Sequence, residues 1–220
     1  MIRTALAMIM VAALGAPALA DDTFEQKAAA ARPVFNLDEV LWALTAPCDK
    51  GDEVQQRQCR LVRDARAKTE IGATLLVDAD PEALEIGAFS AAKKSLTLQV
   101  SSCVRCKPMQ IDGKPLHITG AAPRSEDGKL KTTWLYDNSR QFADEAAAKA
   151  WVATLDGSRV QMVIKISDRK RWQVGGKDGL LVDVLAWRVI TPCSGAVVIA
   201  SPASGNAEPD KKSCPVPMKQ

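Results

Sequence analysis

Six cysteines constrain this 220-residue chain more than any other feature of its sequence. They fall into three neighbouring pairs, namely Cys48 with Cys59, Cys103 with Cys106, and Cys193 with Cys214. An even set of cysteines is typical of disulfide bonding where the chain reaches an oxidising compartment. The grouping suggests three local bonds, although spacing alone does not choose among the possible pairings.

The first 20 residues indicate such a compartment. Arg3 precedes an apolar run over residues 5–16, and the small residues Ala18 and Ala20 precede two aspartates. These three parts are typical of a cleavable secretory signal peptide. The apolar run is shorter than the roughly 20 residues that span a bilayer. We therefore expect residues 1–20 to be removed, and the mature protein to be secreted or periplasmic without a membrane span.

The length and charge of the remainder limit what the protein can be. About 200 residues suffice for one domain with a real hydrophobic core. The formal net charge of the chain is only +3. A nucleic-acid-binding protein usually carries a strongly basic face, so no nucleic-acid partner is expected.

Helical spacing dominates the first part of the domain. Asn36 can cap a helix whose apolar residues recur at helical intervals up to Leu44, and Pro47 ends it. Asp52 with Gln55 offers a capping box for a second helix. A Cys48–Cys59 bond would join these two helices, so residues 36–68 are predicted to form a helical hairpin.

From residue 71 the apolar residues alternate with a period of two, which predicts strands. The candidate strands cover residues 73–77, 84–89, 95–101, 114–119, 129–136, 159–166, 180–190 and 195–200, with one helix at 144–155. Helices that come first and strands that follow one another favour an α+β fold over a doubly wound one. The predicted fold is an N-terminal helical hairpin followed by a largely antiparallel sheet, sandwich or barrel-like, with one further helix.

The same pattern divides the chain into segments. Residues 21–35 are polar and alanine-rich and are predicted to form a flexible leader. Residues 36–200 form a single domain, sheet-rich over 71–200. Residues 201–220 are predicted to be a tail that a Cys193–Cys214 bond pins to the domain.

The CxxC motif at Cys103 and Cys106 is the sharpest chemical signal. A thioredoxin-type redox pair begins a helix, whose dipole lowers the thiol pKa. Here the motif follows a predicted strand, and Lys107-Pro108 follows it. Arg105 and Lys107 could still stabilise a thiolate. A purely structural disulfide is the competing interpretation, yet so short a loop contributes less stability than the other two bonds would.

Metal and cofactor chemistry have little support. Haem attachment needs a histidine directly after the motif, where Lys107 stands. A zinc site needs four ligands, and no second Cys or His pair accompanies the motif. No metal and no cofactor are therefore expected.

Catalytic residues are not marked either. The single histidine, His117, would have to serve any triad, and its strand position predicts a solvent-facing or neighbour-paired side chain. Asp183 stands in an otherwise apolar strand, where a buried carboxylate would need a partner or a raised pKa. Neither residue is joined to a nucleophile by any motif.

A cationic segment with an aromatic residue is the remaining candidate site. Arg169, Lys170, Arg171 and Trp172 stand at a predicted hairpin tip and could bind an anionic envelope polymer or a lipid headgroup. A solvated turn is the alternative interpretation.

Together these patterns favour an exported bacterial envelope protein that acts as a non-catalytic binding or scaffolding module. Its partner would be an envelope protein or an anionic envelope polymer. The alternative is a periplasmic thiol–disulfide protein that uses Cys103 and Cys106, and an envelope hydrolase with a dispersed site is a weaker third possibility.

Overall fold

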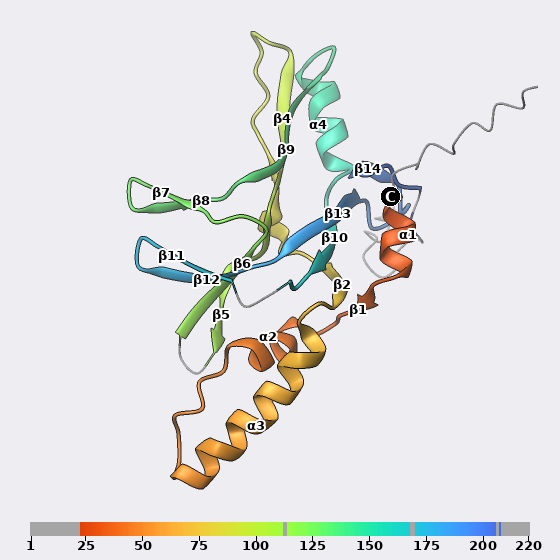
Figure 1. Cartoon of the computed structure of the whole chain (residues 1–220). Coiled ribbons are helices and arrows are strands. Elements are labelled where there is room, and N and C mark those ends of the chain that lie inside the picture. The colour runs from red at the N-terminus through yellow and green to blue at the C-terminus, as the bar shows by residue number, and fades with distance from the viewer. Residues whose placement is uncertain (1–22, 112–113, 168–169, 206, 208–220) are drawn as a thin grey trace, which may run out of the picture.

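The computed structural model describes residues 23–111, 114–167, 170–205 and 207, and it has a mixed α+β architecture with open sheets (Figure 1). The expected signal peptide, Arg169, Cys214 and most of the expected tail lie outside the described residues. None of the helices in the described ranges has the length and apolar character needed to cross a bilayer.

A five-stranded sheet forms the centre of the molecule. Its order is β1 (Arg32–Pro33), β2 (Thr74–Asp78), β10 (Arg159–Lys165), β13 (Asp183–Ile190) and β14 (Val197–Ser201). Only β1 and β2 run parallel; the other neighbours are antiparallel. Val160, Met162 and Ile164 are buried on one face of β10, as the alternating apolar pattern predicted.

A four-stranded sheet and a three-stranded sheet extend from this centre. The four-stranded sheet has the order β11 (Arg171–Val174), β12 (Lys177–Leu181), β6 (Lys114–Thr119) and β5 (Cys103–Ile111). The three-stranded sheet has the order β3 (Leu84–Ile86), β4 (Ser95–Ser101) and β9 (Trp134–Gln141). The hairpin of β7 (Arg124–Glu126) and β8 (Lys129–Lys131) projects beside that of β11 and β12 (Figure 1).

The helices begin at clear capping residues. Asn36 caps α2 (Leu37–Thr45), and Asp52 with Gln55 forms a complete capping box at the start of α3 (Glu53–Glu70). Asp144 caps α4 (Glu145–Ala153). The one-turn 3₁₀ helix η1 (Pro81–Ala83) follows β2. These caps were readable in the sequence because each satisfies backbone N–H groups within three residues.

The main core lies between α2 and the two larger sheets. Leu41 and Leu44 of α2, Met162 and Ile164 of β10, and Ile118 of β6 all belong to one buried cluster. α3 packs against α2 and extends away from the sheets (Figure 1). The Cys48–Cys59 disulfide joins the segment after α2 to the second turn of α3.

Several parts of the chain differ from the sequence-based expectation, and β5, β7 and β11 are strands that the apolar pattern did not predict. The segment predicted to be a flexible leader contains α1 (Phe24–Ala29), because Phe24 is completely buried against Val163 and Ala186. The predicted strand 180–190 is divided between β12 and β13, which lie in different sheets. The predicted strand 129–136 is likewise divided between β8 and β9.

Candidate functional site

The Cys103–Cys106 disulfide lies at the start of strand β5, not at the start of a helix. The pairing of β5 with β6 shifts register on both sides of Arg105, so the disulfide spans a bulged stretch of the strand. Cys103 is buried, and its N–H donates to Ser101 Oγ at 3.0 Å. Cys106 is half-buried, so it is the more accessible of the two cysteines.

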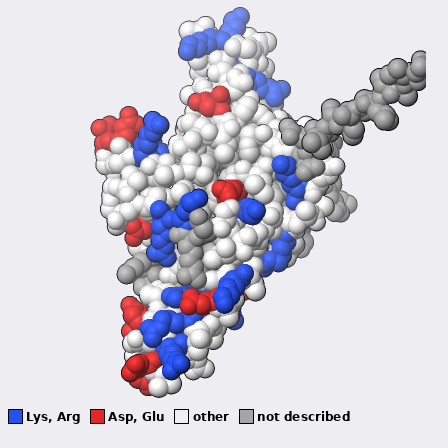
Figure 2. Space-filling view, viewed as in Figure 1, with Lys and Arg blue, Asp and Glu red and all other residues white. Residues whose placement is uncertain are grey.

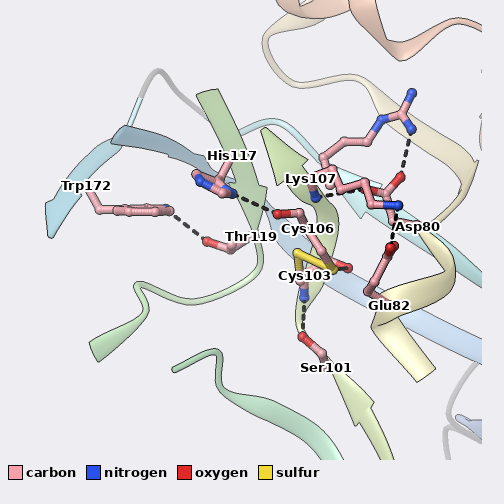
Figure 3. Close-up of a disulfide and its surroundings, with 10 residues drawn as sticks. Asp80, Glu82, Ser101, Cys103, Cys106, Lys107, His117, Thr119 and Trp172 are labelled. Carbon is pink, nitrogen blue, oxygen red and sulfur yellow. Dashed lines mark hydrogen bonds and ion pairs between the residues drawn. A yellow bond between two sulfur atoms is a disulfide. The ribbon is translucent and has the colours of Figure 1, made fainter. Parts of the chain in front are cut away.

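A buried carboxylate connects this strand to η1 (Figure 3). Arg105 Nη1 donates to Asp80 Oδ1 at 2.7 Å, and the Lys107 N–H donates to Asp80 Oδ2 at 3.1 Å. Lys107 Nζ in turn lies 2.6 Å from Glu82 Oε1. This hydrogen bond lowers the pKa of Glu82 and raises the pKa of Lys107. The cations beside the disulfide are thus paired with carboxylates, which reduces the support they could give to a thiolate.

His117 packs against the other side of the disulfide loop. Its Nδ1 lies 3.0 Å from the Cys106 carbonyl oxygen, which can only accept, so the proton of the neutral ring is on Nδ1. The ring stacks on Trp172 with centroids 5.9 Å apart. Burial lowers the pKa of His117, and the charge of Lys177 lowers it further. The imidazole is therefore neutral at physiological pH.

Trp172 is held in β11 by a polar and a steric contact. Its Nε1 donates to Thr119 Oγ1 at 3.0 Å. The indole lies directly over Gly179 of β12, where a Cβ atom would stand only 2.1 Å from Cε2. Only glycine leaves room for the ring at this position. Trp172, His117 and Thr119 consequently form one ordered wall (Figure 3).

These residues surround a pocket of about 360 Å³, which we call the disulfide pocket. One wall comes from β6, β11 and β12, a second from the β7–β9 region, and a third from η1 and β3. It is lined by aromatic, charged and hydroxyl side chains that include Glu82, Glu85, Ser101, Cys103, Cys106, His117, Thr119, Lys129, Thr132, Trp134, Trp172 and Lys177. Groups from two sheets, from the β7–β8 hairpin and from η1 therefore converge on one hollow.

A second hollow continues from the disulfide pocket along the β7–β8 hairpin. It has a volume of about 780 Å³. Glu85, Leu130, Thr132 and Trp134 line both hollows. The half-buried Trp134 thus stands where the two hollows adjoin.

The other cysteines lie elsewhere. The Cys48–Cys59 disulfide belongs to the α2–α3 pair and does not line the disulfide pocket. Cys193 is disulfide-bonded, while Cys214, its expected partner, lies outside the described residues.

The remaining sequence candidates are dispersed. Asp183 is exposed and accepts a hydrogen bond from Ser167, so it is not an isolated buried carboxylate. Lys170 and Arg171 are exposed, but Trp172 is buried in the pocket wall instead of standing at a hairpin tip. His117 is buried and paired with a neighbour, which was one of its two expected states.

Several residues in or beside the pocket carried no chemical motif. Thr119 and Trp134, which line the pocket, looked like ordinary strand positions. Asp80, which does not line it, precedes a proline and looked like a turn residue. One usable signal was Gly179, because a glycine inside an apolar strand often marks a close approach of another group. The partner of that glycine, Trp172, was not apparent from the sequence.

No protein-family profile, curated protein or solved structure matches this chain.

Proposed function

We propose that this is an exported bacterial envelope protein that acts as a non-catalytic binding module, with the disulfide pocket as its ligand site. The observation that carries the proposal is the convergence of His117, Trp172 and Trp134 on one hollow beside a covalently closed loop. Aromatic surfaces with a few polar groups in a concave site are typical of ligand pockets.

The lining favours an acidic glycan as the class of ligand. Sugar rings have apolar faces that can stack on the half-buried indole of Trp134. Lys129 and Lys177 can pair with carboxylate groups of such a ligand, because Glu82 is already engaged by Lys107. Hydroxyl groups of Ser101 and Thr132 offer hydrogen bonds to sugar hydroxyls.

The proposal also includes the arrangement of the two helices and of the two larger sheets. We infer that the α2–α3 pair is a helical hairpin closed by Cys48–Cys59, and that the two larger sheets form a sandwich-like body around their shared core. Residues 1–20 would direct export and be removed, so that the domain folds where its disulfides can form.

A titration with N-acetylmuramyl dipeptide, which joins a sugar ring to a peptide with one free carboxylate, tests the ligand class. We expect indole fluorescence to change with a Kd of roughly 0.1–1 mM, as for a small ligand with few contacts. Trp134→Ala and Lys177→Ala should each weaken binding at least about tenfold, since each removes a main contact.

Lys149→Ala is the matched control, because Lys149 pairs with Glu145 on α4 and does not line the pocket. It should bind as the unmodified protein does. Binding that survives both pocket substitutions would move the ligand site elsewhere, and no fluorescence change or heat at saturating dipeptide would refute this class of ligand.

Thiol–disulfide exchange is a second candidate function, favoured by the half-buried Cys106 at the pocket. An external thiolate would attack Cys106 Sγ, form a mixed disulfide and release the Cys103 thiolate. A second external thiol would then displace Cys106, so that two electrons pass to the protein and an oxidised external disulfide leaves. The paired cations around β5 make Cys103 a poor leaving group, which is why this function stands second.

Mass spectrometry of protein recovered from the periplasm tests export and redox activity together. We expect a mature chain beginning at Asp21, with Cys103 and Cys106 remaining oxidised at millimolar glutathione poised near the potential of a secretory compartment. If they are reduced while Cys48 and Cys59 stay bonded, exchange becomes the leading function. Retention of residues 1–20 would contradict export.

A further inference from the structure

Large exposed apolar side chains are concentrated on one part of the molecule. Among the described residues they are Phe35, Val54, Leu61, Val62, Ile71 and Leu185. All except Leu185 belong to α3 or to segments that flank the α2–α3 pair. Val54 is 74% exposed and Leu61 is 65% exposed. Such clustering marks an interaction surface more often than scattered exposed residues do.

The exposed residues of α3 form a regular seam. Val54, Gln58, Leu61, Ala65 and Lys68 are all exposed and follow one another at intervals of four and three residues. This is the spacing of a coiled-coil seam, which lies along one side of a helix. The opposite side of α3 packs on α2 and carries the disulfide-bonded Cys59 and the buried Ala67. The seam therefore faces away from the rest of the domain.

The charged side chains beside the seam would meet unlike charges if a second copy of α3 ran in the opposite direction. Glu53, Arg57 and Asp64 are exposed along one edge of it, and Lys68 is the last residue of the seam. In an antiparallel pair of α3 helices centred near Leu61, Glu53 meets Lys68 of the other copy and Arg57 meets Asp64. Both matches occur at the same register, and symmetry repeats each of them. A parallel pair would instead bring like charges together.

The mixed surface charges favour a second copy of this chain as the partner. Figure 2 shows blue and red side chains interspersed at the end of the molecule that α2 and α3 occupy in Figure 1. A lipid surface or a polyanion would favour one sign of charge. Asp64 already accepts hydrogen bonds from Arg63 at 3.0 and 3.1 Å, so the pairing with Arg57 would share this carboxylate.

We propose that the seam of α3 binds the same seam of a second copy of this chain, antiparallel and about a two-fold axis. Leu61 lies at the centre of this interface, where it contacts its symmetry mate. The Cys48–Cys59 disulfide holds α3 against α2, so the seam is presented without further ordering of the chain.

The interface is small. An 18-residue helix is about 27 Å long, so the paired seams bury less than the roughly 1,200 Å² of a standard stable interface. The dimer is therefore in fast equilibrium with the monomer, with a dissociation constant on the order of 10⁻⁵ M.

Sedimentation equilibrium of the mature protein between about 1 and 500 µM tests the proposal, because this range brackets the expected constant. The mean mass should rise toward twice that of the monomer. Leu61→Asp should raise the dissociation constant more than tenfold. Val62→Asp, on the same helix but off the seam, is the matched control and should change it less than threefold.

Charge reversal tests the register. Arg57→Glu and Asp64→Arg should each weaken association, and the double variant should restore it. Circular dichroism confirms that every variant stays folded. A chain that is monomeric at 500 µM, an unaffected Leu61→Asp variant, or a double variant without recovery overturns the proposal. Binding of the monomer to phosphatidylglycerol vesicles through Leu61 would assign the seam to a lipid and overturn it equally.

Discussion

Replacing Asp80 by alanine is expected to lower the free energy of unfolding by about 2 to 4 kcal/mol. The side chain of Asp80 is 8% exposed and that of Arg105 is 35% exposed. Removal of the carboxylate leaves the Lys107 N–H without its acceptor and leaves the half-buried guanidinium of Arg105 with only its longer ion pair, 3.7 Å, to Asp38. The loss is smaller than for a fully buried pair, because water can reach the arginine.

Urea denaturation of Asp80→Ala and Asp78→Ala measures this difference directly. Asp78 is the matched control, because its half-exposed carboxylate pairs with Arg159 at the surface and should contribute only about 0–1 kcal/mol. Asp80→Asn keeps an acceptor for the Lys107 N–H and should fall between the two. Equal losses for both alanine variants would refute the role of Asp80 as the connection between η1 and β5.

The substitution of Asp80 by alanine should also affect ligand binding in the disulfide pocket. η1 carries Glu82 into the pocket lining, and β5 carries Cys106. Because Asp80 holds these two elements together, Asp80→Ala should weaken ligand binding even though its own carboxylate does not line the pocket. Asp78→Ala should leave binding unchanged.

Local sequence signals predicted much of the secondary structure. The capping box of Asp52 and Gln55 correctly marked the start of α3, and the helix predicted over residues 144–155 coincides closely with α4. The alternating run over residues 95–101 coincides with β4, and the prediction for 114–119 coincides with β6. These signals succeed because caps and alternation depend on residues close together in the chain.

Contacts between segments that are distant in the sequence explain where the structure differs from the predicted secondary structure. Phe24 completes a buried cluster with Val163 and Ala186, more than 100 residues away, and this packing orders a helix in an alanine-rich segment. The run 180–190 looked like one central strand, yet the chain passes from one sheet to another at Val182. The run is apolar on both faces, so nothing in it marks the point at which the chain changes sheets.

The candidate site, like the fold, could be predicted only in part from the sequence. Cys103 and Cys106 were identified from their spacing, and their disulfide is present. His117 and Trp172 were singled out separately, but their stacking depends on the pairing of β6 with β12 and of β12 with β11. Sheet order of this kind is set by the whole fold, so the pocket could not be assembled from the sequence.

Trp172→Ala is expected to have the largest effect on both stability and binding. Trp172 is 6% exposed, and truncation of a buried tryptophan costs about 3 to 5 kcal/mol. The change also removes the donor to Thr119 and the stacking partner of His117. Thermal and urea denaturation give the stability, and the fluorescence of the remaining indoles reports dipeptide binding, which should be lost.

Gly179→Ala provides a specific test of how the indole is held. The three atoms nearest to an added Cβ all belong to Trp172, at 2.1 to 2.4 Å, so the methyl group and the ring cannot share the space. In the unmodified protein this substitution should cost about 1 to 3 kcal/mol by overpacking, and it should displace the ring from the pocket wall. The backbone at Gly179 does not have a positive φ, so strain of the main chain does not contribute.

The double variant separates this contact from general damage. With Trp172 replaced by alanine, the added methyl group meets no indole, so Gly179→Ala should cost less than about 0.5 kcal/mol. The double-mutant cycle therefore yields a coupling energy close to the whole cost of the single Gly179→Ala substitution. Additive losses would mean that the glycine serves the strand and not the ring, and the steric account of the pocket wall would then be wrong. A large coupling, together with weakened dipeptide binding by Gly179→Ala alone, ties the position of the indole to the function of the pocket.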